Sequence, residues 1–502
     1  MEVGETFLRQ ATQFMGDGDL SSALASLHQA TESGINAEQT HKWLVVLHTL
    51  YCFCECEKLA GSLMENPDVR TEQLLSAARL FFEISRYKIA TDLTRQVNEL
   101  QPGNPDTLAI LASCLERDGM NDQAKQFLHE SIAIDPSHVR TTRMLAHLER
   151  RDSDFASARI RLEKHLQQYP SSDDWRLQYE LAAVLDRLGE HCRAMQVLCT
   201  AKAQLAPYIE MQAFEKMSTR QWEIVQQLTS ERLRKWNSNC ELKPNLRLCL
   251  LAGFPRSGTT LLENILISHI DCVGTDETGI MFSQFTDPLI MQAETASEGI
   301  EELDSFNADE LSAGRYEFLR CTEEYIQEAV DGRWLIEKEP LLTANLAVPM
   351  RLFPDAKIIM PLRDPRDVVI SYFFTLVPVG VSSLASVELG ETCRFYASVM
   401  RHWLYLKQVI PEAQWLELRY EDLLENPETQ TRKLADFLAI EWSDALLSHH
   451  KNLSERKVST PTYDDVSKPL YKRSIARWKN YEEALAPHLH YLKPYIEAFG
   501  YE

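Results

Sequence analysis

A spacing of 34 residues recurs along the N-terminal half of the chain. Three columns of residues keep this spacing in register: Pro102, Pro136 and Pro170; Ala90, Ala124 and Ala158; and Ala78, Ala112 and Ala146. A fixed period of this length indicates tandem copies of one supersecondary unit. One copy cannot bury its apolar face alone, so the copies must stack on one another to build a continuous core.

The columns resemble the tetratricopeptide repeat, in which small residues let two helices pack closely and a proline closes the unit. Repeats are predicted at about 71–104, 105–138 and 139–172, then at 173–208 with a shift of two residues, and in degenerate form at 5–38. Ala183, Ala194 and Pro207 mark the shifted copy. The resemblance implies a surface that binds a peptide, a protein or another copy of the chain.

Three cysteines alternate within residues 51–57. On a helix, Cys52 and Cys56 share a face and Cys54 does not. The sequence offers no further ligands at the spacing of a zinc site, so we interpret the three as packing residues.

Composition narrows the class of protein. At 502 residues the chain is long enough for two or more domains, because single cores stop growing near ~250–300 residues. No apolar run approaches the ~20 residues of a membrane helix, and the first residues lack the basic and apolar regions of a signal peptide. Eleven scattered cysteines favour a reducing compartment, so we predict a cytoplasmic protein. The net charge of −22 argues against nucleic-acid binding.

Residues 253–260, Gly-Phe-Pro-Arg-Ser-Gly-Thr-Thr, follow an apolar run and precede a predicted helix. A strand, a glycine-containing loop and a helix N-terminus together offer backbone N–H groups to an anion. A nucleotide triphosphatase carries a lysine after the second glycine. This chain has Thr259 there, and its cation, Arg256, lies inside the loop. The pattern predicts a site for an anionic nucleotide that does not serve phosphoryl transfer.

Short apolar runs alternate with helical patterns after this loop. Strands are predicted at 246–253, 334–338, 356–362 and 415–419, and helices at 259–268, 365–375, 390–410, 427–439 and 486–499. This alternation predicts a parallel sheet covered on both faces. We therefore expect an α-solenoid of tetratricopeptide repeats at 1–224, a polar connector at 225–245 and an α/β domain at 246–502.

Two motifs about 100 residues apart carry a second resemblance. Residues 254–262, Phe-Pro-Arg-Ser-Gly-Thr-Thr-Leu-Leu, resemble the 5′-phosphosulfate loop of sulfotransferases that use 3′-phosphoadenosine 5′-phosphosulfate (PAPS). Residues 362–372, Leu-Arg-Asp-Pro-Arg-Asp-Val-Val-Ile-Ser-Tyr, resemble the 3′-phosphate motif of that family. There an arginine and a serine eight residues later hold the 3′-phosphate, and here they are Arg363 and Ser371. The alternative is that Arg363 joins Asp364 and Arg366 in a surface ion-pair cap.

Further matches resemble the protein-tyrosine sulfotransferase branch. Glu277 stands where those enzymes have a catalytic glutamate, although Gly279 replaces the arginine two positions later. Lys338, within Glu-Lys-Glu-Pro, corresponds to a lysine that assists catalysis, and Tyr420 to a tyrosine near the adenine nucleotide. Residues 459–478 resemble the segment that folds over the cofactor. The resemblance implies these cofactor-binding residues: Arg256, Ser257, Gly258, Thr259, Thr260, Arg363, Ser371, Tyr420, Ser459 and Arg477.

The resemblance implies in-line transfer of a sulfuryl group from PAPS to an acceptor hydroxyl, with 3′,5′-ADP as the product. A sulfuryl group carries one negative charge, so fixed cations suffice and no metal is expected. Glu277 is expected to take the hydroxyl proton, and Lys338 and Arg256 to stabilise charge on the leaving oxygen. The acceptor is a hydroxyl compound, with a peptide or protein among the candidates. His269 is expected to pack against carbonyl groups.

Two other classes stay open: a P-loop nucleotide kinase or triphosphatase, and a repeat scaffold whose α/β domain has lost activity. Residues 294–331 carry twelve acidic side chains against Arg315 and Arg320. They form either a solvated amphipathic insertion or a surface that attracts a cationic acceptor. The repeats are expected to recruit the acceptor or a protein partner.

Overall fold

The computed structural model describes residues 2–16, 19–205, 211–238, 241–376, 386–448 and 474–502. Contacts among these residues divide the chain into an N-terminal unit, Met1–Leu145, and a C-terminal unit, Ala146–Glu502. The division falls within the repeats and not at 224. The domain bounds drawn from sequence patterns therefore stay a prediction about which parts fold independently.

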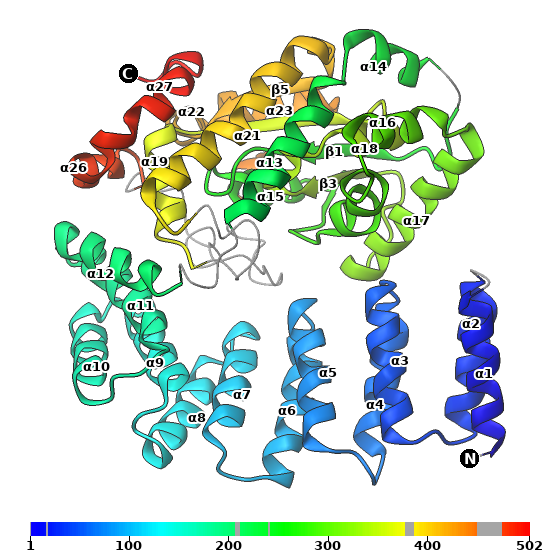
Figure 1. Cartoon of the computed structure of the whole chain (residues 1–502), viewed down its shortest axis with the longest axis vertical. Coiled ribbons are helices and arrows are strands. Elements are labelled where there is room, and N and C mark those ends of the chain that lie inside the picture. The colour runs from blue at the N-terminus through cyan, green and yellow to red at the C-terminus, as the bar shows by residue number, and fades with distance from the viewer. Residues whose placement is uncertain (1, 17–18, 206–210, 239–240, 377–385, 449–473) are drawn as a thin grey trace. The chain divides into compact units, whose positions relative to one another are not determined.

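The N-terminal unit is a row of antiparallel helix pairs (Figure 1). Its helices are α1 (Glu2–Gly16), α2 (Leu20–Glu32), α3 (Ala37–Thr49), α4 (Phe53–Glu65), α5 (Thr71–Glu83), α6 (Tyr87–Leu100), α7 (Pro105–Arg117) and α8 (Asn121–Ile134). Helix α9 (Val139–Arg151) runs across the division. Ala78, Ala90, Ala112 and Ala124 are at most 1% exposed. Their small side chains let the paired helices approach closely, as the period predicted.

The helices at 71–100 and 105–134 confirm the predicted repeats. The first 70 residues contain two helix pairs, whereas the sequence analysis predicted one, because α3 and α4 keep the helical pattern without the proline and alanine columns. Cys52 and Cys56 are buried and Cys54 is exposed. The shared face expected for the first two cysteines is confirmed.

The C-terminal unit begins with further repeat helices, α10 (Phe155–Gln168), α11 (Asp174–Arg187) and α12 (His191–Ala203). Ala182, and not Ala183, is the fully buried alanine of α11. Part of the predicted connector at 225–245 is helical, because α13 (Met211–Gln226) ends at its start and α14 (Ser230–Asn237) lies within it. Leu233 and Trp236 of α14 are buried. The polar residues of this stretch lie on the exposed side of α14.

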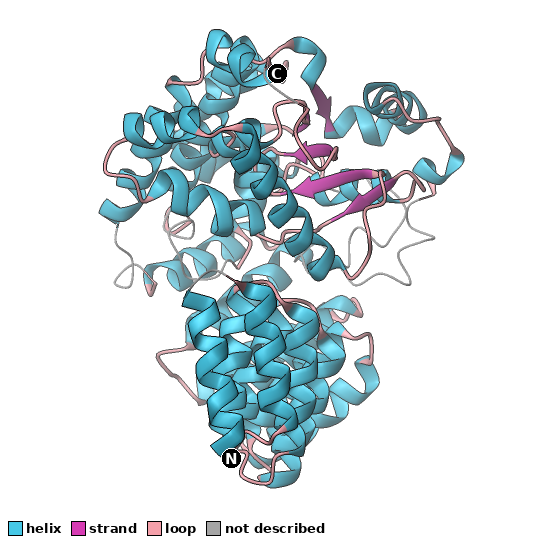
Figure 2. Ribbon diagram, turned by 90° about the vertical axis from the view of Figure 1, so that its right-hand side faces the viewer, coloured by secondary structure: helices cyan, strands magenta, loops and turns pink. Residues whose placement is uncertain are grey.

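Five parallel strands form the sheet: β1 (Arg247–Leu251), β2 (Cys272–Gly274), β3 (Trp334–Lys338), β4 (Lys357–Leu362) and β5 (Trp415–Arg419). Their order is β2-β3-β1-β4-β5, so the chain starts in the middle and crosses over in both directions. Figure 2 shows the strands in magenta among the helices. Four strands were predicted. The three residues of β2 are too few to form a sequence pattern.

Helices and short turns connect the strands up to β5 and continue the chain after it. They are α15 (Thr259–Ile267), η2 (Met281–Met291), α16 (Ala296–Ser305), α17 (Ala308–Ile326), η3 (Pro340–Ala344), α18 (Ala347–Leu352), α19 (Pro365–Phe373), α21 (Leu389–Val409), η4 (Glu412–Gln414), α22 (Tyr420–Glu425), α23 (Pro427–Leu438), η5 (Asp444–Leu447), η7 (Arg477–Tyr481), α26 (Glu482–Leu485), η8 (Ala486–His488) and α27 (Leu489–Ala498).

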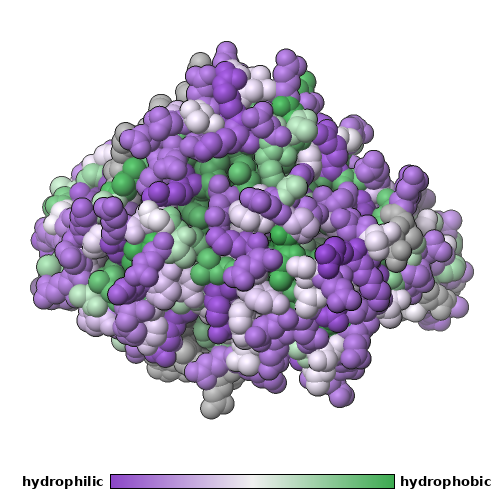
Figure 3. Space-filling model, turned by 90° about the horizontal axis from the view of Figure 1, so that it is seen from above, coloured by the Kyte–Doolittle hydropathy of each residue, from purple (hydrophilic) through white to green (hydrophobic). Residues whose placement is uncertain are grey.

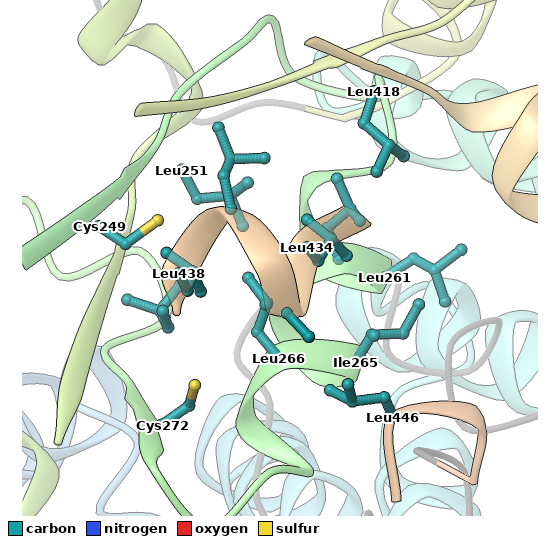
Figure 4. Close-up of a cluster of buried hydrophobic side chains, with 14 of the residues drawn as sticks. Cys249, Leu251, Leu261, Ile265, Leu266, Cys272, Leu418, Leu434, Leu438 and Leu446 are labelled. Carbon is teal, nitrogen blue, oxygen red and sulfur yellow. The ribbon is translucent and has the colours of Figure 1, made fainter. Parts of the chain in front are cut away.

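The sheet is covered on both faces, as predicted. On one face Leu251 of β1 and Leu418 of β5 pack against Leu262 and Leu266 of α15 and Leu434 of α23 (Figure 4). On the other, Trp403 of α21 donates to the Glu417 carboxylate of β5 at 2.7 Å. A strand alternates its side chains, so the leucine and the glutamate of β5 point to opposite sides. β1 pairs in parallel with both β3 and β4, so the carboxyl ends of these three strands lie together at one edge of the sheet.

The acidic residues at 294–331 form α16 and α17, where most carboxylates face solvent. Arg315 is buried and donates to the carbonyl of Pro244 at 3.1 Å, so it does not offset that charge at the surface. The face in Figure 3 is mostly hydrophilic, with apolar side chains in small separate areas. Among the described helices, none combines the length and the apolar character that crossing a bilayer requires.

Candidate anion-binding and catalytic site

The loop between β1 and α15 has the backbone geometry of an anion-binding turn. Gly253 (φ 128°), Arg256 (φ 74°) and Gly258 (φ 103°) all adopt left-handed conformations. A Cβ atom on Gly258 would lie 2.7 Å from Cδ2 of Tyr420. The loop thus turns tightly enough to bring its N–H groups to the start of α15, where no preceding helical turn supplies carbonyl partners.

Two hydrogen bonds connect the two predicted nucleotide motifs. The Nε–H of Arg256 donates to Oγ of Ser371 at 3.1 Å. Nη1 of Arg363 donates to the carbonyl of Arg256 at 3.0 Å. β1 and β4 are parallel neighbours, so the loops at their carboxyl ends meet. The structure therefore brings together Arg256, Arg363 and Ser371 from motifs about 100 residues apart.

Arg363 points into the protein and is 7% exposed. Its Nη2 donates to the carbonyl of Ser474 at 2.6 Å, and its guanidinium lies 5.2 Å from the ring centre of Tyr420. Its buried Nε has no hydrogen-bond partner among the described residues. Arg366, in contrast, pairs with Asp364 at 2.8 Å, and Asp364 caps α19. The ion-pair cap exists, but Arg363 is not part of it.

A buried charge cluster lies beside the loop at the end of β3. Nζ of Lys338 lies 3.1 Å from Glu263 and 3.6 Å from Glu277, and it also bonds to Asp276 at 2.5 Å. The lysine is 0% exposed, whereas the Glu277 side chain is 40% exposed. Glu277 is therefore the most exposed member of this cluster, since the Asp276 side chain is 18% exposed and that of Glu263 4%.

The pKa values of this cluster follow from burial and mutual charge. Desolvation raises the pKa of Glu277 above its ordinary value, since the pull of Lys338 is offset by Asp276 and Glu263. Burial lowers the pKa of Lys338, but the three carboxylates outweigh burial and keep the ammonium charged. Glu277 is thus a carboxylate with raised basicity beside a fixed cation, a combination that suits a general base.

The sequence analysis did not identify Glu263 or Asp276. Glu263 is 3% exposed on the inner face of α15, and a Cβ on Gly274 would lie 2.9 Å from its Oε1. The signal was present, because an acid within the apolar run Leu-Leu-Glu-Asn-Ile needs a buried partner. Nothing in the sequence identified that partner as Lys338.

The other predicted residues lie as follows. Ser257, Thr259 and Thr260 are buried in the loop and the first turn of α15. The Tyr420 hydroxyl lies 2.9 Å from Oγ of Ser474. Arg477 pairs with Asp186 of α11 at 3.0 Å, which the sequence did not indicate. Ser459 lies outside the described residues.

His269 and Phe254 have packing roles. Nε2 of His269 lies 2.7 Å from the carbonyl of Glu441, and Nδ1 accepts the N–H of Asp271 at 3.2 Å. The expected carbonyl partner of this histidine is confirmed. Phe254 is 1% exposed and packs edge-on against Tyr372, Phe395 and Tyr396. These rings anchor the loop on α19 and α21.

The site fits a nucleotide with two phosphate groups. The loop packs so closely on Tyr420 at Gly258 that a Cβ atom there would clash with the ring, and the loop ends at a helix N-terminus. The buried Nε of Arg363 has no hydrogen-bond partner among the described residues. The buried Oγ of Ser257 likewise has none there. Orphaned buried donors of this kind are rare and point to a missing partner. The donors are cationic or neutral, as an anion requires.

The C-terminal half matches a known family. The model of the Sulfotransferase family covers residues 250–444, and so includes both nucleotide motifs, Glu277 and Lys338. This half therefore contains a domain of the sulfotransferase family, as the motifs indicated.

Three curated proteins are similar to this chain in sequence. An uncharacterised protein of Aquifex aeolicus is 25% identical over 437 residues, which are 84% of this chain and 55% of the relative. The protein-tyrosine sulfotransferase of Drosophila melanogaster is 25% identical over 289 residues, 54% of this chain and 53% of the relative. Protein-tyrosine sulfotransferase 1 of Danio rerio is 28% identical over 47% of this chain and 66% of the relative. The chain thus spans about half the length of the first two.

Solved structures resemble the two halves separately. A tetratricopeptide repeat protein from Parabacteroides merdae has a TM-score of 0.31 and 18% identity, and covers 39% of this chain and 78% of its own. The sulfotransferase domain of the Synechococcus PCC 7002 olefin synthase has a TM-score of 0.30 and 21% identity, over 49% and 97%. Similarities at these scores add nothing to the fold described above.

Proposed function

We propose that the C-terminal domain transfers a sulfuryl group from PAPS to an acceptor hydroxyl. The observation that carries the proposal is the pair of hydrogen bonds by which Arg256 and Arg363 connect the two nucleotide motifs. Two anion-binding loops joined in this way suit a nucleotide with a 5′- and a 3′-phosphate group. PAPS, when bound, supplies the sulfuryl group and leaves as 3′,5′-ADP.

Each of the predicted site residues has its own role in the proposed transfer. Backbone N–H groups of Gly258–Thr260 and the Ser257 hydroxyl hold the 5′-phosphate, Arg363 and Ser371 hold the 3′-phosphate, and Tyr420 lies along the adenine nucleotide. Arg256 stabilises negative charge on the oxygen that leaves sulfur. Such preorganised donors act strongly in a water-poor site.

Glu277 takes the proton of the acceptor hydroxyl, and its raised pKa suits this task. Lys338 is enclosed by three carboxylates, so in this arrangement it holds Glu277 in place. The direct contact with the leaving oxygen that the sequence suggested requires Asp276 or Glu277 to move away. Transfer by these groups alone needs no metal ion, and the repeats recruit the acceptor or its carrier protein.

Nucleotide binding tests the cofactor class. We expect 3′,5′-ADP to stabilise the full chain without metal, by about 2.7 kcal/mol at a hundredfold excess over Kd, and so to raise its melting temperature. Arg363→Ala is expected to abolish the shift. Arg432→Ala is the control, because this variant also removes an arginine ion pair, with Glu428 of α23 at 2.8 Å, and that pair belongs to neither nucleotide motif. Stabilisation only by ATP with Mg²⁺ would instead support a kinase or triphosphatase, and no response to either would support a scaffold.

The acceptor is best sought among hydroxyl groups on peptides, since two of the relatives are named protein-tyrosine sulfotransferases. Gly279 replaces the arginine of that branch, and α16 and α17 present many carboxylates. A basic tyrosine peptide should therefore have a higher kcat/KM than an acidic one, with an advantage that salt reduces. Equal rates at low salt would argue against steering by this surface.

A further inference from the structure

Residues 474–481 lie between the nucleotide motif and the repeat helices. We call them the bridging segment. On one side they contact α19, which carries Ser371, and on the other they contact Asp186 of α11 and His191 at the start of α12. All of these elements lie in the C-terminal unit. The segment is thus a physical connection between a repeat and the predicted 3′-phosphate site.

The inner side of the bridging segment holds Arg363. The Ser474 carbonyl accepts from Nη2 of Arg363 at 2.6 Å, while Nη1 is bound by the carbonyl of Arg256. The Asp367 carboxylate accepts the N–H groups of Ala476 at 2.7 Å and Trp478 at 2.8 Å. The orientation of the guanidinium therefore depends on where the segment places its carbonyl group.

The backbone of the segment must be held in this shape. Ala476 has φ 58°, a left-handed conformation that costs a residue with a Cβ roughly 1–2 kcal/mol. Such a conformation persists only where surrounding contacts determine it. Asp367 supplies two of these contacts, Phe374 packs against Arg477 and Tyr481, and Asp186 of the repeat binds the same two side chains.

The outer side of the segment is fixed by one carboxylate. Oδ2 of Asp186, at the end of α11, pairs with Arg477 at 3.0 Å, and Oδ1 accepts the hydroxyl of Tyr481. The Asp186 side chain is only 14% exposed. The Arg477 guanidinium lies 4.8 Å from the ring centre of Phe374, which follows the last residue of α19. The ion pair thus clamps the segment against the end of α19.

A second contact from the same repeat supports this clamp. Lys202 of α12 is 0% exposed and lies 4.3 Å from the ring centre of Phe373, the last residue of α19. Its ammonium group donates to the carbonyl of Ser386. Both helices of this repeat therefore contact the C-terminal end of α19, the helix that carries Ser371: α11 indirectly through Arg477, and α12 directly through Lys202.

We propose that Asp186, in a repeat, is a positioning residue for the 3′-phosphate: through Arg477 and Tyr481 it fixes the bridging segment, whose Ser474 carbonyl aims Arg363. The inference rests on the proposed function and goes beyond it, because it gives a repeat residue a role in nucleotide recognition. It also assigns Arg477 to the clamp and not to the phosphate.

The test compares two nucleotides by calorimetry on the full chain. 3′,5′-ADP carries the 3′-phosphate and adenosine 5′-phosphate lacks it, so the ratio of their Kd values measures recognition of that group. We expect Asp186→Asn to weaken 3′,5′-ADP binding about tenfold while adenosine 5′-phosphate binding is unchanged. Asp186→Glu, which keeps the charge, should restore part of the ratio.

The matched control is Glu163→Gln. Glu163 of α10 pairs with Arg193 of α12 at 2.6 Å, so this variant removes an ion pair from the same helices without touching the segment. Its Kd ratio should equal that of the unaltered protein. A general loss of repeat stability would lower the melting temperature in both variants and leave both ratios unchanged, which would overturn the inference.

The remaining outcomes separate the two proposals. If the unaltered protein does not bind 3′,5′-ADP, the proposed function fails and the inference falls with it. If Asp186→Asn keeps the ratio, only the inference fails. If Asp186→Asn binds 3′,5′-ADP more tightly, Arg477 is itself a phosphate ligand that Asp186 restrains, and the inference is again wrong. If Asp186→Asn does not fold, Tyr481→Phe decides by the same ratio, since it removes one hydroxyl group.

Discussion

Single charged residues at the end of β3 account for much of the chemistry of the site. Successive side chains of a strand point to opposite faces, so Glu337 and Lys338 leave the sheet on opposite sides. Lys338 meets three carboxylates. Glu337 is 0% exposed on the other side, and burial raises its pKa to about 7 although the Thr275 hydroxyl opposes this. The charge of Lys338 is therefore compensated by its neighbours, whereas a charge on Glu337 destabilises the folded protein.

The raised pKa of Glu337 makes stability depend on pH. The folded protein holds this proton more tightly than the unfolded chain, so stability falls as pH rises from about 4.5 to about 7 and then levels. Glu337→Gln cannot ionise, so its unfolding free energy should exceed that of the unaltered protein by up to about 3 kcal/mol at pH 8. Urea titrations at pH 5 and pH 8 measure this. The exposed Glu483→Gln should show no such gain, and equal curves for all three proteins would contradict the prediction.

Glu277→Gln separates catalysis from stability. Turnover should fall by ~10²-fold or more, because no carboxylate then takes the hydroxyl proton. In the unaltered protein, activity should rise with pH through the raised pKa of Glu277, and this limb should be absent from the variant. Lys338 keeps Glu263 and Asp276, so the melting temperature and the Kd for 3′,5′-ADP should be preserved. A matching loss of nucleotide binding would contradict the assignment to proton transfer.

At the scale of elements, strands with an apolar run and a following helix were predictable. β1, β3, β4 and β5 are such strands, and each predicted span agrees with the structure to within a few residues. β2, η2 and α14 were missed or misread, because three residues, a π-helix and a helix rich in charged residues lack the periodic apolar pattern on which prediction depends. Both nucleotide motifs were found because they lie at strand ends. Asp276 and Asp186 were not, because their partners are distant in the sequence.

Two glycines with left-handed backbones, Gly258 and Gly279, allow a prediction about the loop between β1 and α15. A Cβ on Gly258 would meet Tyr420 at 2.7 Å, whereas one on Gly279 would meet nothing within 4 Å. Gly279→Ala should cost only the backbone penalty, roughly 1–2 kcal/mol. Gly258→Ala should cost more and also remove binding of 3′,5′-ADP, because the loop must open. Chemical denaturation and calorimetry measure both, and equal effects would argue against the close approach of Tyr420.

At the scale of the whole molecule, the repeats are not simply appended to the enzyme domain. The period of 34 residues predicted the helix pairs but gave no sign that the chain divides between Leu145 and Ala146. That division depends on long-range contacts, such as those of Asp186 and Lys202 with residues far along the chain. Sequence patterns report local periodicity and do not report such contacts.

The division predicts how truncation acts. A fragment of residues 139–502 keeps α9–α12 with the sheet, so it should bind 3′,5′-ADP about as tightly as the full chain. A fragment of residues 211–502 loses Asp186 and Lys202, and it should melt at a lower temperature and bind the nucleotide more weakly. Thermal melts and calorimetry on both fragments test this. Identical behaviour of the two would show that α9–α12 contribute nothing to the nucleotide site.

The contact between Asp186 and Tyr481 spans 295 residues. At a synthesis rate of about 5–20 residues per second, α11 leaves the ribosome roughly 15 to 60 s before its partner. Repeat helices rely on local contacts and fold faster than sheets. A repeat that has already folded therefore exposes the Asp186 carboxylate to chaperones or to premature pairing until Tyr481 is synthesised and the proposed nucleotide site can form.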